Sequence, residues 1–360
     1  MREDKTPKYQ VLSDYLRKEI RDGRLAPGQR IPSENELVKE FDLSRVTVRH
    51  AIDILEEENL LVRMKGSGCY VSERLAGSGK KRIAVMMTYL DGYIFPQILQ
   101  AIESTLSAKG YSIQIAFTNN QVMKEREILQ DILEKDEVAG VIAETTKSAL
   151  SNPNVGYYEK LVKRNVPVLF INSFYPESKI PHVSMNDVMV GKIATEHLIQ
   201  RGHKEIAGIF KLDDGQGHQR FLGYMQALEE ANLPLRESNI LWIDTMDVKQ
   251  FGLLREKVLS RLKGCTGVIC YNDEVAYELY RMLEKEGIRV PEDMSIMGVD
   301  ASEDLEIGSV GISTVPYPIK ELGAKAARNI LRMIRMPGYD GNHEYAVKVL
   351  EKGSVKDLNK

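Results

Sequence analysis

Two arginines, Arg45 and Arg49, stand four residues apart in the stretch 44–53 (SRVTVRHAID), which places both on one edge of a helix. Ser44 precedes them, and serine is a preferred helix cap because its hydroxyl accepts a hydrogen bond from a first-turn backbone N–H. A helix start offers free N–H groups and a positive dipole, and guanidinium groups bind phosphates and the edge of guanine. The stretch therefore has the chemistry to bind DNA. An ordinary amphipathic surface helix is the alternative.

The residues around this stretch favour the first interpretation, because they predict helix-turn-helix followed by a β-hairpin. The signals, in chain order, are a helix over 9–20, a stop at Gly23, a capping box at 33–36 (SENE), a turn at Asp42-Leu43, the helix from Ser44, and strand-like runs at 60–63 (LLVR) and 69–71 (CYV) around a glycine-bearing turn. This combination of elements predicts a winged helix.

Residues 9–71 resemble the GntR-type winged helix-turn-helix, on motifs that include SENELVKEFDLSRVTVRHAIDILEEENLL and RMKGSGCYV. The resemblance implies that the DNA contacts fall on Glu34, Arg45, Thr47, Arg49, Lys65, Gly66 and Gly68. Asp42 and Asn59 stand where the family favours glycine, and both residue types tolerate a left-handed backbone. We therefore expect the fold to survive these departures.

Length and composition predict a soluble protein of two or three domains. The chain has 360 residues, of which 43% are hydrophobic and 28% charged. It contains no apolar run near the roughly 20 residues that span a bilayer, and its charged N-terminus leads into no signal sequence. We therefore expect a cytoplasmic protein with no membrane association. The three cysteines, Cys69, Cys265 and Cys270, form no CxxC pair, so we expect no disulfide framework, zinc site or cofactor.

The net charge of −3 requires that any DNA site depend on local segregation of charge. Residues 1–74 hold 14 basic and 14 acidic side chains, so the expected winged helix is not a basic domain as a whole.

A second architecture begins after a Gly/Ser-rich linker at 73–81 (ERLAGSGKK). From Arg82 onward, eight strand-like runs alternate with helical ones, which predicts parallel sheets in a doubly wound α/β fold. Because this is more than one compact core usually holds, we expect two βαβ lobes. The expected domains are 1–72 (winged helix), 73–81 (linker) and 82–360 (two lobes).

The cleft between two such lobes lies at the carboxyl ends of their strands, so residues that follow strands are candidate ligand contacts. A sugar requires bidentate polar groups around its rim and an aromatic ring against its face. Both kinds are present at strand ends: Tyr89, Asp91, Tyr93, Phe95, Glu144, Lys147, Asp213, Asp214, Arg220, Asn272, Asp273 and Asp300. We interpret Gly215-Gln216-Gly217 as a flexible turn rather than a phosphate loop, and Trp242 as a core residue.

The second domain resembles the effector domain of LacI/GalR-type repressors, a periplasmic-binding-protein-like fold. The motifs include VSMNDVMVGKIATEHLIQRGHKEIAGI, HQRFLGYMQAL, GVICYNDEVAYELYRMLEKEGIRVPEDMSIMGVDASE and ISTVPYPIKELGAKAARNIL, and the resemblance covers 82 to about 352. It implies sugar contacts at Asp187, Arg220 and Asp300, and possible contact at Asn272, with Asp273 as the cap of the following helix. For Arg220 and Asp300 a structural ion pair between the lobes is the alternative. The full expected ligand set is Asp91, Tyr93, Lys147, Asp187, Arg220, Asn272 and Asp300.

The joining of a GntR-type reader to a LacI-type sensor resembles the arabinose repressors. That resemblance implies a homodimeric repressor that binds operator double-stranded DNA and is released by L-arabinose or a related small sugar. The alternative is a LacI-type regulator of another ligand, such as another sugar, a phosphosugar or a purine, including a ligand that acts as corepressor. A doubly wound enzyme is a further alternative, but the sequence lacks a GxGxxG after the first strand, a P-loop and any catalytic triad. We therefore expect no enzymatic activity.

Overall fold

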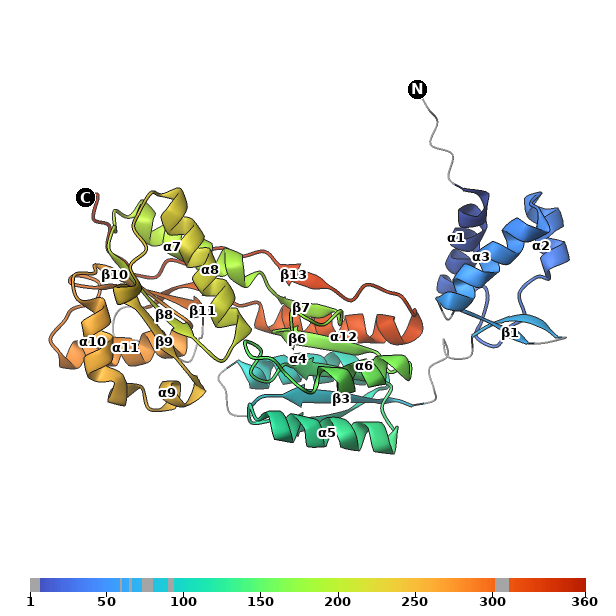
Figure 1. The fold of residues 1–360 in the computed structure, drawn as a ribbon, viewed down its shortest axis with the longest axis horizontal. Helices are drawn as coiled ribbons and strands as arrows, with labels where there is room; N and C mark the ends of the chain where they lie inside the picture. The colour runs from blue at the N-terminus through green and yellow to red at the C-terminus, as the bar shows by residue number, and fades with distance from the viewer. Residues whose placement is uncertain (1–6, 59, 65–66, 73–79, 90–93, 302–310) are drawn as a thin grey trace, which may run out of the picture.

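The computed structural model describes residues 7–58, 60–64, 67–72, 80–89, 94–301 and 311–360. Its elements form an N-terminal winged helix and two α/β lobes, drawn in chain order from blue to red in Figure 1. The winged helix and the two-lobed α/β fold expected from the sequence are both present.

The winged helix consists of α1 (Lys8–Arg21), α2 (Glu34–Phe41), α3 (Arg45–Glu57), β1 (Leu61–Met64) and β2 (Gly68–Val71). Ser33 and Glu36 form the expected capping box at the start of α2. Asp42 ends that helix with a φ of +49°, the left-handed conformation that aspartate tolerates. The apolar faces of the three helices and the hairpin meet in one core, which includes Leu12, Leu16, Leu37, Val48, Ile52, Leu55, Leu61 and Val71.

Lobe 1 is a six-stranded parallel sheet with the order β13-β7-β6-β5-β3-β4. Its strands are β3 (Arg82–Met87), β4 (Ser112–Phe117), β5 (Gly140–Glu144), β6 (Val168–Asn172), β7 (His182–Met185) and β13 (His343–Tyr345). Its helices are α4 (Phe95–Ser107), α5 (Val122–Lys135), α6 (Val155–Lys163) and α12 (Ile319–Arg335). Residues of α4 and α12 pack in one apolar cluster, and residues of α5 and α6 pack in another, so the central strands are buried between two layers.

Lobe 2 is a five-stranded parallel sheet with the order β12-β11-β10-β8-β9. Its strands are β8 (Ile206–Lys211), β9 (Ile240–Ile243), β10 (Gly267–Cys270), β11 (Ser295–Asp300) and β12 (Ser313–Pro316). Its α-helices are α7 (Asp187–Gln200), α8 (Gly215–Glu230), α9 (Thr245–Lys249), α10 (Arg255–Leu262) and α11 (Asp273–Lys285), with 3-10 turns η2 (Glu237–Asn239) and η3 (Phe251–Leu254). One apolar cluster continues from lobe 1 into α7 and α8, and a second includes α10 and α11.

The two sheets contain eleven strands within the described chain, not the eight expected from the sequence. The strands that were missed are β7, β12 and β13, which have only four, four and three residues. They lie where the chain passes between the lobes, before α7, before α12 and before the C-terminal segment, whose Leu350 bridges to Thr314 of lobe 2. Their sequences, HVSM, STVP and HEY, contain too few apolar residues to form a strand-like run, whereas the equally short β9 and β10 are almost wholly apolar.

The interpretation of Gly215-Gln216-Gly217 as a flexible turn is wrong, because these residues form the first turn of α8. Asp214 caps the helix by accepting a hydrogen bond from the Gln216 N–H at 3.2 Å. A Cβ at position 217 would lie 2.1 Å from the Lys211 backbone oxygen. The second glycine therefore permits a close approach between α8 and the end of β8 rather than flexibility.

Trp242 lies within β9 and packs against the core. Its ring contacts Phe210 and Phe221, with centroids 5.9 and 5.0 Å away. This agrees with its interpretation as a core residue.

Candidate functional site

The N-terminal end of α3 carries the candidate DNA-reading residues. Ser44 caps the helix, since its hydroxyl accepts a hydrogen bond from the Thr47 N–H at 3.1 Å. The Arg49 guanidinium pairs with Glu34 of α2 at 2.9 Å and remains 62% exposed. Arg45 donates to Asn35 at 2.8 Å. Both guanidinium groups are therefore held by α2 and stay accessible to a DNA surface.

The segment before α2 places a basic residue, Arg30, against the wing, and no prediction from the sequence covered it. Gly68 has a φ of +120°, and a Cβ at this position would lie 2.7 Å from Nε of Arg30. The backbone of Arg30 bridges to Tyr70 of β2, and its guanidinium lies beside Gly68, next to the turn of the hairpin. Its only sequence signal is a basic residue before the apolar Ile31. Lys65 and Gly66, the other expected wing contacts, lie outside the described residues.

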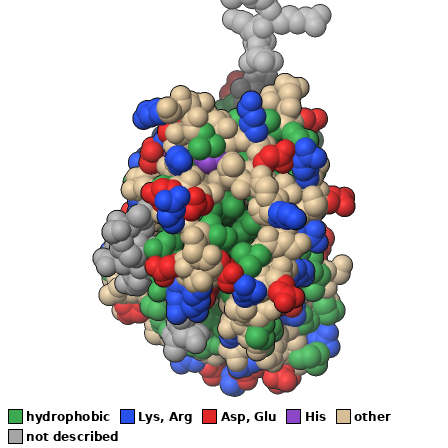
Figure 2. Space-filling model, turned by 90° about the vertical axis from the view of Figure 1, so that its left-hand side faces the viewer, with side chains coloured by type: hydrophobic (Ala, Val, Ile, Leu, Met, Phe, Trp, Pro, Cys, Tyr) green, Lys and Arg blue, Asp and Glu red, His purple; other side chains and the backbone are tan. Residues whose placement is uncertain are grey.

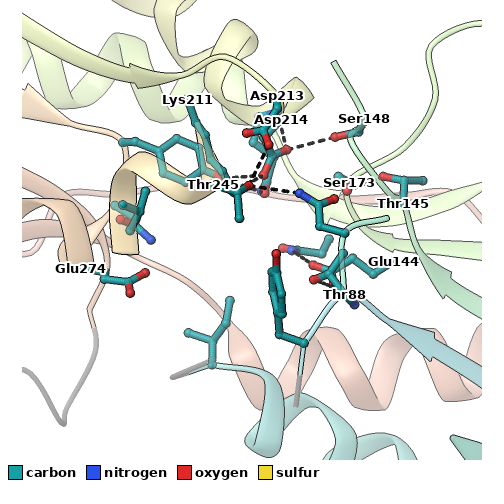
Figure 3. A pocket seen from close by; sticks show the side chains of 18 of the residues that line it. Thr88, Glu144, Thr145, Ser148, Ser173, Lys211, Asp213, Asp214, Thr245 and Glu274 are labelled. Atoms are coloured by element: carbon teal, nitrogen blue, oxygen red, sulfur yellow. Dashed lines mark hydrogen bonds and ion pairs between the residues drawn. The ribbon is translucent and has the colours of Figure 1, made fainter. Parts of the chain in front are cut away.

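A cavity of about 240 Å³ lies between the two lobes. Figure 3 shows Thr88, Glu144, Thr145, Ser148 and Ser173 of lobe 1 across from Lys211, Asp213, Asp214, Thr245 and Glu274 of lobe 2. This volume is slightly below the roughly 300–1,000 Å³ of most ligand pockets. The cavity is therefore suited to a small polar ligand.

A buried ion pair forms part of the lobe 2 wall. The Nε of Arg220 in α8 lies 2.8 Å from the Asp187 carboxylate at the start of α7, and the side chains are 3% and 2% exposed. Arg220 also donates to the Tyr271 backbone oxygen and lies 4.8 Å from the centroid of the Tyr271 ring. Burial raises the pKa of Asp187 to about 6 despite the charge of Arg220, so this carboxylate is ionised at neutral pH. Of the pair, Arg220 lines this cavity and Asp187 lines a neighbouring one.

The expected alternative for Arg220, an ion pair between the lobes, is not what the structure has. Its ionic partner Asp187 belongs to the same lobe. Asp300, the other residue of that alternative, is the last residue of β11, lines the cavity and has a φ of +111°. A non-glycine residue in such a sparsely populated conformation is typical of functional sites.

Hydrogen bonds join the two lobes across the cavity. The Ser148 hydroxyl of lobe 1 donates to Asp214 at 3.0 Å and accepts from the Gly215 N–H at 2.9 Å. Asn120 donates to Thr245 at 3.1 Å, and Thr245 donates to Asp213 at 2.8 Å. These contacts link the lobe 1 loops directly to the beginning of α8 and to α9.

Asp213 retains one free acceptor in this network. The residue is 7% exposed, and its Oδ1 has no hydrogen-bond partner among the described residues. A buried carboxylate oxygen without a donor is unfavourable. The structure therefore leaves this buried oxygen with an unmet hydrogen-bonding capacity in the wall of the cavity.

The roles expected for Asn272 and Asp273 are exchanged in part. Asn272 caps α11 by accepting from the Val275 N–H at 3.0 Å, and it also lines the cavity. Asp273 is the first residue of the helix and accepts from Thr314 at 2.9 Å. The expectation that Asp273 caps the helix is wrong, because the Asn272 side chain, one residue earlier, satisfies the free N–H of Val275.

Two strand-end residues differ in their surroundings. Glu144 is buried, which raises its pKa, and it accepts hydrogen bonds from the Thr88 N–H at 2.8 Å and from Asn172 at 2.7 Å. It therefore organises the ends of β3, β5 and β6. Lys147 lines the cavity with a φ of +47°, and its N–H donates to Asn120 at 2.8 Å. Asp91 and Tyr93, two expected ligand contacts, lie outside the described residues.

Four residues that line the cavity, Asn120, Thr245, Tyr271 and Gln216, were not among the expected ligand contacts. Asn120 and Thr245 follow β4 and β9 within a few residues, a placement that could have found them. Tyr271 follows β10 directly, and its hydroxyl donates to Asp214 at 2.6 Å. Gln216, in the first turn of α8, donates to Asp187 at 3.3 Å. Their partners come from distant parts of the chain, so spacing could not reveal the contacts.

The surface of the lobe 2 end carries acidic and basic side chains interspersed, as Figure 2 shows. This face therefore has no continuous positive region of the kind that binds DNA. In the described part of the chain, no group of three or more His, Cys, Asp or Glu side chains could hold a metal ion. Likewise, no described helix is both long enough and apolar enough to cross a membrane.

Two family descriptions match the chain in separate segments. The bacterial regulatory proteins of the gntR family match residues 8–71, and the periplasmic binding protein-like domain matches residues 195–355. The first segment contains the candidate DNA-reading helix. The second contains Arg220, Asn272 and Asp300.

Relatives with the same overall length extend this likeness. An arabinose metabolism transcriptional repressor of Geobacillus stearothermophilus is 36% identical over 99% of this chain and 100% of its own. A protein of the same description from Halalkalibacterium halodurans is 36% identical over 92% of this chain and 91% of its own.

Solved structures resemble the two-lobed part. The transcription regulator CcpA of Lactococcus lactis has a TM-score of 0.68 at 24% identity, over 77% of this chain and 100% of its own. A LacI family regulator of Enterococcus faecium with bound ribose has a TM-score of 0.66 at 27% identity, over the same shares.

Proposed function

Because the chain belongs to the family of the arabinose metabolism transcriptional repressors, we propose that it binds an operator through α3 and the wing, and that L-arabinose in the interlobe cavity releases it. The members of this family are regulators rather than enzymes. We place this action in the cytoplasm, with the DNA that the repressor binds.

The observation that carries the effector assignment is a small cavity lined from both lobes by polar side chains, among them Asp213, Arg220 and Asn272. Carboxylate, guanidinium and amide groups of this kind bind sugar hydroxyls. Tyr89 and Phe95 also line the cavity and offer aromatic surface to a sugar ring. The site thus combines both kinds of side chain that sugar recognition requires.

A neutral sugar fits the charges of this cavity better than a phosphosugar does. The cationic lining residues are Lys147, Lys211, Arg220 and Lys249, and the acidic ones are Glu144, Asp213, Asp214, Glu274 and Asp300. Arg220 is already paired with Asp187, and Lys211 lies 3.8 Å from Asp214. The five acidic lining residues also outnumber the four cationic ones, so a phosphate group would meet a net negative lining.

Release from DNA follows from a shift between conformations. The lobe-to-lobe hydrogen bonds of Ser148 and Asn120 stabilise the closed cavity, and a ligand that contacts both lobes adds to them. We propose that the chain acts as a homodimer, whose two winged helices bind half-sites at a spacing set by the effector domains. Closure then changes this spacing and removes both reading helices together.

The experiment is a titration of the full-length protein with ligands, alone and on DNA. Calorimetry with L-arabinose, D-ribose, D-xylose, D-glucose, a pentose phosphate and hypoxanthine identifies the effector. Fluorescence anisotropy with a DNA fragment that the protein binds measures release. We expect heat with L-arabinose and a loss of DNA affinity on its addition. No heat with any pentose refutes the arabinose assignment, and tighter DNA binding on ligand addition refutes induction.

The variant Asp213→Ala tests the cavity itself, with Asp131→Ala as its control. Asp131 is an exposed aspartate of α5 that pairs with Lys135. We expect Asp213→Ala to weaken L-arabinose binding, while the control binds it as the wild type does. Equal sugar affinity in both variants contradicts binding at this site.

A further inference from the structure

The turn that carries Lys147 and Ser148 into the cavity is held in an unfavourable backbone conformation. Lys147 has a φ of +47°, which is uncommon for a residue other than glycine, asparagine or aspartate. Such strain costs about 1–3 kcal/mol and persists only where the surrounding structure enforces it. The contacts that enforce it therefore determine whether Ser148 reaches Asp214 and Gly215 across the cavity.

Tyr175 supplies one of these contacts from outside the cavity. Its hydroxyl accepts a hydrogen bond from the Thr146 N–H at 2.8 Å and donates to Oε1 of Glu125 at 2.8 Å. The side chain is 1% exposed and does not line the interlobe cavity. It can therefore act on a ligand only through the turn.

Glu125 fixes the direction of the Tyr175 hydroxyl. It is 0% exposed and lies in the first turn of α5. Besides Tyr175, it accepts from Asn152 at 2.7 Å, from Asn154 at 2.8 Å and from Tyr158 at 2.8 Å. Because the Glu125 carboxylate accepts the hydrogen bond that Tyr175 donates, the Tyr175 oxygen remains free to accept a hydrogen bond from the Thr146 N–H.

We propose that Tyr175, oriented by Glu125, is a positioning residue for effector binding, because it holds the Thr146–Ser148 turn in the conformation that presents Lys147 and Ser148 to the cavity. This proposal rests on the proposed function in one respect, namely that the effector binds between the lobes. Without the Tyr175 hydroxyl the turn relaxes toward ordinary backbone angles, and Ser148 loses its position at the start of α8.

Tyr158 provides a matched control. Its hydroxyl donates to the same Glu125 oxygen at the same 2.8 Å, its side chain is 0% exposed, and its ring lies 6.3 Å from that of Tyr175. Its hydroxyl has no bond to the turn among the described contacts. Tyr158→Phe and Tyr175→Phe thus remove the same atom from the same cluster, and only the second also removes the bond to Thr146.

Two measurements on the full chain compare the variants. Hydrogen exchange without ligand reports the turn, and we expect exchange of the 146–148 amides to be about tenfold faster in Tyr175→Phe and unchanged in Tyr158→Phe. Calorimetry with L-arabinose reports its consequence. We expect Tyr175→Phe to weaken binding by about 5- to 30-fold, the effect of losing one buried hydrogen bond, and Tyr158→Phe to leave binding unchanged.

Unchanged exchange at 146–148 in Tyr175→Phe overturns the proposal, and so does an equal loss of sugar affinity in both variants, which would assign the effect to general damage of the buried cluster. If the wild-type protein binds no L-arabinose, the proposed function fails. The exchange measurement, made without ligand, still decides the positioning role.

Discussion

Replacing the buried ion pair of lobe 2 decides whether Arg220 recognises the effector or only completes the wall of the cavity. The two side chains are 3% and 2% exposed and lie 2.8 Å apart. The variants are Arg220→Met, which keeps the side-chain volume, Asp187→Asn, and the two together. Arg220→Met alone leaves a buried carboxylate without its cation, and we expect it to lower the free energy of unfolding by about 3–5 kcal/mol.

The double variant separates the two roles. With no charge left to compensate, it should recover roughly half or more of that loss in stability. If Arg220 contacts the sugar, the double variant still binds L-arabinose more weakly than the wild type by about 1.5–3 kcal/mol, or roughly 10- to 150-fold, because a charge-assisted hydrogen bond is missing. Urea unfolding and calorimetry give the two quantities.

The control is Arg236→Met, which removes an arginine from an exposed pair with Glu205 on the same lobe, where the side chains are 51% and 39% exposed. We expect a change of less than about 1 kcal/mol in stability and none in sugar binding. Recovery of sugar affinity in the double variant, to within about threefold of the wild type, would refute direct contact. Arg220 would then be structural.

Three further predictions concern DNA binding, pH dependence and helix packing. Arg49→Ala should weaken operator binding by about 1–3 kcal/mol and leave sugar affinity unchanged. The control Lys18→Ala on α1 should change operator binding far less. Fluorescence anisotropy in the absence of sugar measures the operator affinity of both variants. Burial raises the pKa of Asp187 from its ordinary 3.8 to about 6, so the folded protein keeps this proton where the unfolded chain has released it. The contribution of Asp187 to the free energy of unfolding must therefore fall as the pH rises from about 4 to 6 and stay level above pH 6. Urea unfolding of the wild type and of Asp187→Asn at a series of pH values should show this fall in the wild type only. If the two proteins have the same pH dependence, the raised pKa of Asp187 is contradicted. A Cβ at Gly191 would lie 1.9 Å from a backbone oxygen of α8, so Gly191→Ala should destabilise the folded protein by about 1–3 kcal/mol. Gly156 in α6 has open space around it, so Gly156→Ala should stabilise the folded protein by about 0.5–1 kcal/mol. Equal effects of the two variants in thermal unfolding would refute the packing argument.

The sequence predicted those features that depend on near neighbours along the chain. The cap at Ser44 and the left-handed Asp42 follow from side chains acting within one helical turn, and the structure has both. The placement of Asp300 at the cavity also followed from its position, because the carboxyl ends of parallel strands face the cleft, whereas that of Arg220, within α8, followed from the family resemblance.

The sequence by itself therefore determined the two fold classes, the longer or more apolar elements and the edge of each sheet at which a ligand would lie, but not the strands β7, β12 and β13. Only the tertiary structure decided which side chains meet there. Arg220 pairs with Asp187, 33 residues earlier, and Asn120 reaches Thr245, 125 residues later. Tyr175 reaches Glu125, 50 residues earlier. Such partners depend on how two sheets and their connecting segments pack, and no local spacing encodes that packing.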